Sequence, residues 1–149
     1  MQIRSLLAGT ALAALLAGCA AGPTDQAAEP AMEAATATYA GTLPCRNCAG
    51  IDLNVTLDGE VQDPLEDRTF ELEASYREHP QDPPDENYAG NWEVIEGTEQ
   101  DGDATVYELT PDGDGQTYYF LRVDDQTLEL IDPNLRRFQN SEMLQLNRQ

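Results

Sequence analysis

Two cysteines separated by two residues form the segment with the clearest potential for chemistry, Cys45-Arg46-Asn47-Cys48. Such a pair can form a short-loop disulfide, act as a redox couple of the thioredoxin kind, or bind a soft metal ion as two thiolates. The thioredoxin alternative is weak because that motif opens a helix, whereas Cys48 leads through Ala49-Gly50 into a strand-like segment at Ile51. A structural zinc site normally needs four N or S ligands, but two thiolates suffice for copper(I). The residues leave the disulfide and the metal site as open alternatives.

The third cysteine, Cys19, closes the tetrapeptide Leu16-Ala17-Gly18-Cys19 after a basic tip and the apolar run of residues 6–16. This arrangement is typical of a secretory signal, and the run is shorter than the roughly 20 residues of a membrane-spanning helix. The tetrapeptide resembles a bacterial lipobox, which implies acylation of the Cys19 thiol and removal of residues 1–18. Ala20 stands where an aspartate would favour the inner membrane. We expect a lipid anchor at Cys19 on the periplasmic side of the outer membrane; the alternative is an ordinary secreted protein.

The chain has a single histidine, His79, in the polar and proline-rich stretch of residues 78–90. We expect this stretch to be a surface loop and His79 to be solvated rather than bound to a metal. Asp112-Gly113-Asp114-Gly115 lacks the later ligands and the closing glutamate of an EF-hand, so it predicts a hairpin turn. No nucleophile and base stand in a recognisable pattern, and we therefore expect that the protein is not an enzyme.

Acidic residues dominate the charge of the chain. It holds 28 Asp and Glu against 8 Arg and no Lys, which gives a net charge of −20. Because phosphate binding needs clustered cations, this balance argues against nucleic acid as a partner and against attraction to anionic membrane surfaces. We expect an acidic, solvated surface. Adaptation to high salt and concentration of metal cations are the functional alternatives.

Composition divides the chain into a signal segment (1–18), a tether (19–38) and a domain (39–149). The tether is rich in Ala, Thr, Glu and Pro, and after Cys19 its only large apolar residue is Met32. Such a segment buries too little apolar surface to offset the entropy lost on ordering. We therefore expect residues 19–38 to be a flexible link between the lipid anchor and the domain.

The domain alternates apolar and polar residues with the period of two that marks half-buried strands. The two clearest strands are residues 51–57 and 70–76. Another strand is expected around Tyr39, and shorter runs lie at 92–95, 105–109, 117–123, 127–131 and 143–146. Gly, Asp and Pro clusters separate the runs and suit antiparallel hairpins. About eight strands result, which predicts an all-β fold and favours a small closed antiparallel barrel, with a sandwich as the second candidate.

The cysteine segment, with the residues around it, resembles the opening of the NlpE-like copper resistance lipoproteins, Y-x-G-x-L-P-C-x-x-C-x-G-I. Here it reads Tyr39-Ala40-Gly41-Thr42-Leu43-Pro44-Cys45-Arg46-Asn47-Cys48-Ala49-Gly50-Ile51. Further similar segments are Gly90-Asn91-Trp92, Leu128-Glu129-Leu130-Ile131-Asp132, Asn140-Ser141 and Leu144-Gln145-Leu146. The resemblance implies a lipocalin-like β-barrel on a lipid anchor, with a role in copper tolerance and envelope-stress sensing.

Three features depart from the pattern of that family. Arg46-Asn47 stands where the family often has an acidic residue, and residues 58–67 and 78–90 look expanded. The second, C-terminal domain of longer members has no counterpart here, which puts in doubt any signalling role that depends on it.

These observations define three hypotheses. In the first, Cys45 and Cys48 bind copper(I) or respond to thiol oxidation on a lipid-anchored barrel, with envelope-stress signalling proteins as partners. In the second, the barrel carries a small apolar ligand, and inward residues such as Trp92, Phe120 and Leu130 should then fail to meet across the core. In the third, the protein is an envelope scaffold that contacts partners through its acidic face, and the disulfide between Cys45 and Cys48 is purely structural.

Overall fold

The two strands with the clearest alternation pair with each other along their whole length. The computed structural model describes residues 35–149, and in it β2 (Gly50–Asp58) and β3 (Thr69–Arg77) are antiparallel, with a register that runs from Gly50 opposite Arg77 to Asp58 opposite Thr69. Their apolar positions share one face, as the period-2 pattern requires, and all of them are buried except Ile51 and Tyr76, which are half-buried. The hydrophobic face of this hairpin forms one wall of the core.

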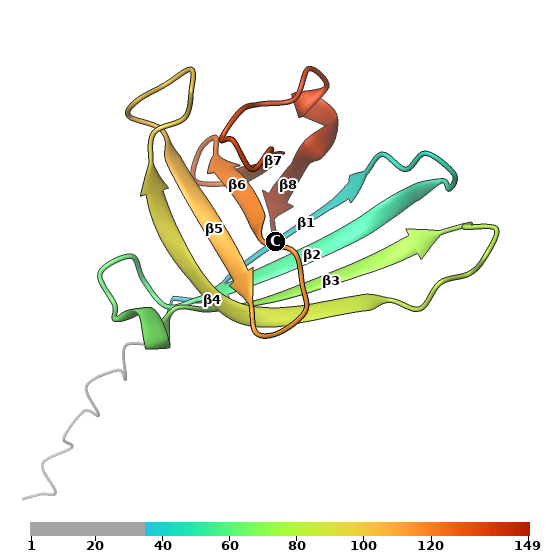
Figure 1. Cartoon of the computed structure of the whole chain (residues 1–149), viewed down its shortest axis with the longest axis horizontal. Coiled ribbons are helices and arrows are strands. Elements are labelled where there is room, and N and C mark those ends of the chain that lie inside the picture. Colours follow the sequence, from blue (N-terminus) through green and yellow to red (C-terminus); the bar gives the residue numbers. More distant parts are fainter. Residues whose placement is uncertain (1–34) are drawn as a thin grey trace, which may run out of the picture. The chain divides into compact units, whose positions relative to one another are not determined.

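Eight strands close into a barrel (Figure 1). In addition to β2 and β3 they are β1 (Ala37–Leu43), β4 (Glu86–Glu96), β5 (Thr105–Pro111), β6 (Tyr118–Arg122), β7 (Thr127–Ile131) and β8 (Gln145–Arg148). Each strand pairs antiparallel with the next along the chain, and β8 pairs with β1 to complete the circle. The predicted all-β class and the closed barrel of about eight strands are confirmed, and the sandwich alternative is wrong.

Strand β4 is longer than the sequence pattern indicated. The predicted loop of residues 78–90 ends at residue 85, because β4 begins at Glu86 and continues the ladder on β3, with Glu86 opposite Ala74 and Tyr88 opposite Leu72. Gly90 lies where β4 passes from β3 to β5. A Cβ atom there would come within 2.1 Å of the Thr110 carbonyl oxygen, so the close approach of β4 and β5 requires glycine.

Two short 3-10 helices interrupt the strand pattern. The first, η1 (Leu65–Asp67), lies between β2 and β3. The second, η2 (Ser141–Leu144), takes the first half of the run that the sequence assigned to the last strand, and only its second half belongs to β8. Met143 is exposed while Leu144 is buried in the core, so one turn of helix places Leu144 against the barrel before β8 begins.

A buried apolar cluster packs the interior of the barrel. Phe70, Trp92 and Phe120 belong to a single buried cluster. The indole N–H of Trp92 donates to the carbonyl oxygen of Asp58 at 2.8 Å, and the guanidinium of Arg68 lies over the indole ring, 5.4 Å from its centroid. These contacts fix the chain's single tryptophan at one end of the barrel, where it helps to line a cavity of about 510 Å³.

A second, smaller apolar cluster lies on the other face of β5, β6 and β7. Val106, Leu121 and Ile131 are buried there, and Leu135 from the segment after β7 packs against them. Within residues 35–149, no helix is long and apolar enough to cross a membrane.

Candidate functional site

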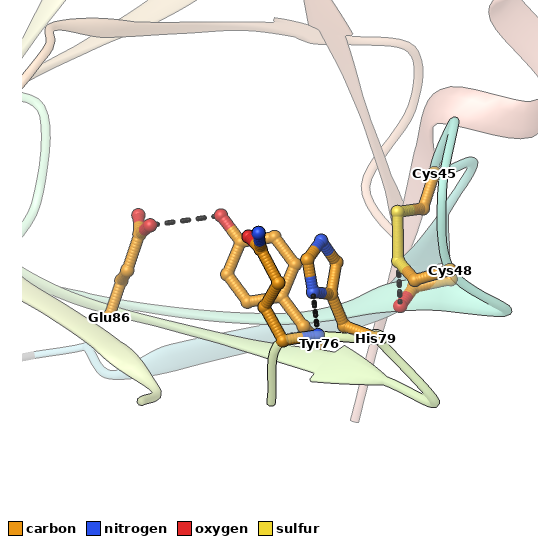
Figure 2. Close-up of a disulfide and its surroundings, with 7 residues drawn as sticks. Cys45, Cys48, Tyr76, His79 and Glu86 are labelled. Atoms are coloured by element: carbon orange, nitrogen blue, oxygen red, sulfur yellow. Dashed lines mark hydrogen bonds between the residues drawn. A yellow bond between two sulfur atoms is a disulfide. The ribbon is translucent and has the colours of Figure 1, made fainter. Parts of the chain in front are cut away.

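The cysteine pair lies in the short loop between β1 and β2 (Figure 2). The last pair of the β1–β2 ladder is Leu43 opposite Ile51. The chain therefore reverses direction within residues 44–50, the segment that carries both cysteines. Cys45 and Cys48 are joined by a disulfide, with their Cα atoms 5.3 Å apart. Both cysteines are half-buried, while the two residues between them are exposed. The pair therefore sits on the rim of the barrel, where molecules in solution can reach it.

Three strands brace the base of this loop. The amide of Ala49 donates to the carbonyl oxygen of Arg77 at 2.9 Å, which fixes the end of the loop to β3. The hydroxyl of Thr42 donates to Asp52 at 2.6 Å, and the guanidinium of Arg77 pairs with the other oxygen of the same carboxylate. The hydrogen bond from Thr42 lowers the pKa of Asp52, burial opposes this shift, and Arg77 adds to it. Asp52 thus links β1, β2 and β3 directly below the cysteines.

The sulfur of Cys48 faces a backbone acceptor. Its Sγ lies 3.3 Å from the carbonyl oxygen of Gly50. In the disulfide this is a contact only, because the sulfur carries no proton, whereas in the reduced form a thiol could donate a weak hydrogen bond there. A Cβ atom at position 50 would lie 2.6 Å from Cγ2 of Thr42. A residue without a side chain therefore lets the loop enter β2.

His79 lies near this end of the barrel but has its own contacts. Its ring meets the ring of Tyr76 edge-on, with centroids 5.9 Å apart, and its Nδ1 accepts a hydrogen bond from the amide of Gln81 at 3.1 Å. The side chain is half-buried rather than fully solvated. Within residues 35–149, no three or more His, Cys, Asp or Glu side chains form a group that could hold a metal ion. The fold thus brings Cys45 and Cys48 together without a third such ligand.

A cavity of about 590 Å³ opens beside the cysteine loop. Leu43 and Pro44, which lead into the loop, form part of its wall, and Tyr76, Glu86 and Tyr88 form another part. The hydroxyls of Tyr76 and Tyr88 each donate to one carboxylate oxygen of Glu86, both at 2.9 Å. Figure 2 shows the Tyr76 hydroxyl directed at Glu86. The carboxylate at the mouth of the barrel is therefore held between two phenols.

The carboxylate of Glu86 changes the pKa values of the two tyrosines. The hydrogen bond to Glu86 is the main cause that raises the pKa of Tyr76 and of Tyr88, since it favours the neutral phenol, and burial adds to both shifts. Sequence reasoning missed Glu86 because it assigned residues 78–90 to a loop. The signal was present: Glu86, Tyr88, Gly90 and Trp92 fall on every second position, the period of a strand.

Of the three interior residues named for the ligand hypothesis, two are buried in the core and one lines the cavity. Trp92 and Phe120 are both buried in the main core cluster, where Trp92 packs edge-on against Tyr107 and Phe120 stacks on Tyr118. Leu130 is only partly buried and lines the cavity. Cavities therefore lie at both ends of the barrel, one of about 590 Å³ beside the cysteine loop and one of about 510 Å³ beside Trp92.

The glycine-rich segment between β5 and β6 forms a turn, as the sequence predicted. The amide of Gly115 donates to the carbonyl oxygen of Gly113 at 3.0 Å, and the two strands beside the turn pair antiparallel. Asp114 and Gly115 contribute to the wall of the cavity. The predicted acylation site, Cys19, and nearly all of the predicted tether lie outside the described residues.

Comparison with protein families adds one finding. The model of the NlpE N-terminal domain matches residues 39–141, which is more than half of the chain. No curated protein and no solved structure matches the sequence. The matched segment begins in β1, includes both cysteines and ends in η2.

Proposed function

The chain belongs to the NlpE N-terminal domain family, and we propose that it is an envelope lipoprotein that responds to copper and to thiol redox state through Cys45 and Cys48. At the level of the family, membership supports a lipoprotein connected with copper and envelope stress. The role of the two cysteines is our own assignment. The observation that carries it is the disulfide in a short loop on the exposed rim of the barrel.

Reduction is the step that makes this pair chemically versatile. A dithiol reductant transfers two electrons and two protons to the disulfide, so that Cys45 and Cys48 become thiols and the reductant becomes a disulfide. Because both sulfurs belong to one short loop, the two thiols can then release their protons and ligate the same copper(I) ion as thiolates. The oxidised pair offers no thiolate. The loop would therefore take up copper(I) only under reducing conditions.

The neighbouring residues support such a two-state loop. The carbonyl oxygen of Gly50, 3.3 Å from Cys48 Sγ, can accept a hydrogen bond from the reduced thiol. Asp52, Thr42 and Arg77 hold the strand ends beneath the loop by contacts that do not involve sulfur. Reduction therefore leaves the support of the loop in place, and only the segment between Leu43 and Ala49 gains freedom.

The place of the protein in the envelope forms part of the same proposal. Acylation at Cys19 would anchor the mature chain to the outer membrane on its periplasmic side, and the residues between Cys19 and the start of β1 at Ala37 would link the barrel to the lipid. We propose envelope-stress signalling proteins as partners, and a binding or sensing role rather than a catalytic one. The net charge of −20 argues against nucleic acid as a partner.

An anaerobic copper(I) competition titration tests the proposal. The protein is the full chain with Cys19→Ser, which removes the predicted acylation site and leaves Cys45 and Cys48 as its only cysteines. We expect the reduced protein to bind one copper(I) tightly. The oxidised protein and the Cys45→Ser/Cys48→Ser variant should bind at least about a hundredfold more weakly, since they lack the thiolates. Equal binding by all three proteins, or no binding by any, would overturn the copper assignment and leave a structural disulfide.

A further inference from the structure

The cavity beside the cysteine loop combines an apolar surface with the carboxylate of Glu86. Its wall includes Leu43, Tyr76, Glu86, Tyr88, Tyr118 and Leu130. Its volume of about 590 Å³ is within the range of pockets that hold small organic molecules. Glu86 lies on the same face of β4 as Gly90 and Trp92, whose side chains or backbone are buried in the barrel. A charged side chain on the inner face of a strand is normally paired with an opposite charge, because burial disfavours an uncompensated charge.

The charge of this carboxylate is not balanced by the protein. Glu86 accepts hydrogen bonds from Tyr76 and Tyr88, which are neutral donors. Within residues 35–149, Glu86 takes part in no ion pair. The second charged residue in the cavity wall, Asp114, is also acidic. The wall therefore carries negative charge alone, and each oxygen of Glu86 keeps free acceptor capacity beside its tyrosine.

Aromatic rings surround the carboxylate. The rings of Tyr88 and Tyr118 lie 6.1 Å apart between centroids, and Tyr118 stacks on Phe120 at 6.4 Å. Tyr76 completes the aromatic wall from β3. The faces of aromatic rings attract cations, and rings packed against the core keep their positions without a ligand. The carboxylate and the aromatic rings therefore both favour a positively charged ligand.

We propose that this cavity binds a small organic cation, an amine with an apolar body. The ammonium group would donate to Glu86 and lie against the tyrosine rings, while the apolar part would contact Leu43, Leu130 and the neighbouring aliphatic wall. A neutral apolar ligand would leave the carboxylate without a counter-charge, and an anion would be repelled by it. The occupant is therefore defined by charge as well as by size. This assignment does not depend on the redox state of the cysteines.

Three small compounds of similar size and different charge test it: phenethylamine, phenethyl alcohol and phenylacetate. We would titrate each compound into the oxidised, nitrogen-15-labelled full chain with Cys19→Ser. The signals to follow are the amide resonances of three residues in the cavity wall, Glu86, Tyr88 and Gln116. High ionic strength is essential, because it screens the general attraction of cations to a chain of net charge −20. The indole N–H of Trp92, which donates to the carbonyl oxygen of Asp58 at the opposite end of the barrel, serves as the control resonance: its shift would indicate binding outside this cavity.

We expect the amine to bind about tenfold or more tightly than the alcohol, since a hydrogen bond to a charged group is worth about that factor, and phenylacetate to bind most weakly. The resonances at the cavity should shift while the indole N–H of Trp92 does not. Equal binding of amine and alcohol would overturn the proposal, as would preference for phenylacetate, shifts centred on Trp92, or no binding of any compound. This comparison uses the unaltered barrel, so it does not depend on the folding of a variant.

Two charge-removing variants locate the selectivity. Glu86→Gln keeps the shape of the side chain and should reduce the affinity for the amine by about tenfold while leaving that for the alcohol unchanged. Glu73→Gln removes the same charge from an exposed position on β3, opposite Asn87, and should change neither. Equal losses in both variants would indicate general electrostatic attraction and overturn the assignment to Glu86. Failure here leaves the copper(I) titration of Cys45 and Cys48 untouched.

Discussion

Arg137 neutralises Glu129, the one charged side chain that is fully buried among the described residues. Its Nε donates to Oε1 at 2.7 Å and its Nη2 to Oε2 at 2.6 Å, while Gln145 donates a longer bond of 3.3 Å. Arg137 itself is about half exposed, with 45% of its side chain accessible. A residue of the long segment before β8 thus covers a carboxylate on β7 with a two-pronged ion pair.

Loss of this pair should destabilise the barrel strongly. Arg137→Ala leaves a buried carboxylate with only Gln145, and we expect a loss of about 2–3 kcal/mol in the free energy of unfolding, measured with urea. Arg122→Ala is the matched control, because its pair with Asp125 is exposed on both sides; it should lose less than about 1 kcal/mol. Adding Glu129→Gln to Arg137→Ala should restore part of the loss. Equal effects of the two arginine substitutions would contradict the role of Glu129.

Asp52 should give the rim a measurable sensitivity to acid. Since its pKa is lowered in the folded protein, chiefly by Thr42, its contribution is complete above the unfolded pKa of about 3.9 and disappears as the pH falls through the folded pKa. Asp52→Asn should therefore lose less than about 1 kcal/mol at neutral pH, because Asp52 and Arg77 are largely solvated.

The difference from the unaltered protein should shrink as the pH falls through the lowered pKa of Asp52 in the folded chain. Urea unfolding from pH 2 to pH 7 measures this. The control is Glu71→Gln, which removes one negative charge from an exposed position on β3 that has no ion pair among the described residues. A loss for Asp52→Asn that grows at low pH would have the wrong sign.

Glu86 should control the titration of its two tyrosines. Because both hydroxyls donate to its carboxylate, the pKa of Tyr76 and of Tyr88 is raised, and Glu86→Gln should shift both pKa values down towards the ordinary phenol value of about 10. Tyr119 is the internal control, since burial is the main cause that raises its pKa and Glu86 is not in contact with it. NMR detection of the tyrosine ring carbons during an alkaline titration resolves the residues. Unchanged values for Tyr76 and Tyr88 would refute the hydrogen bonds.

The disulfide should contribute modestly to stability. It closes a loop of only a few residues, for which the entropy model gives about 2 kcal/mol, and the strand ladders do not pass through it. Cys45→Ser/Cys48→Ser should therefore keep the β-sheet circular dichroism spectrum and lose about 2 kcal/mol or less. Reduction of the unaltered pair should lose a similar amount. An unfolded double variant would mean that the disulfide is essential to the barrel, and its failure to bind copper(I) would then be uninformative.

Gly90 should be intolerant of any side chain. In Gly90→Ala the new Cβ atom would meet the backbone at Thr110, so β4 and β5 must separate, and we expect a loss of about 2–3 kcal/mol. Gly102→Ala is the matched control, because a Cβ atom added there, on the β4–β5 connection, would have no atom within 4 Å; its effect should be within about 0.5 kcal/mol. Thermal unfolding of both variants checks the difference, and similar midpoints would contradict the close approach.

The alternation of residues 51–57 and 70–76 was enough to predict their strands, because the period of two is a local property of an extended chain. Turn residues between successive runs, such as Asp112 to Gly115, were enough to predict antiparallel neighbours. The number of runs then favoured a closed barrel. The family resemblance likewise rested on residues adjacent in sequence, above all the segment from Tyr39 to Ile51.

Features that depend on distant segments were not readable in this way. Residues 86–90 read as part of a loop because prolines and acidic residues dominate the stretch from 78 to 90, and only the pairing with β3 shows that β4 begins at Glu86. Likewise, Met143 resembled a strand residue until the contact of Leu144 with the core required a turn of 3-10 helix before β8.

By itself the sequence determined the strand periodicity, the acidic charge and the placing of two cysteines on one short loop. Only the tertiary structure decided where cavities remain in the barrel, one beside the cysteine loop and one beside Trp92, because that depends on which side chains meet across the closed sheet. It also decided the partner of Glu129, which is buried only once the segment carrying Arg137 folds back over β7. Burial and pairing arise from segments far apart in the chain, and a local pattern carries no record of them.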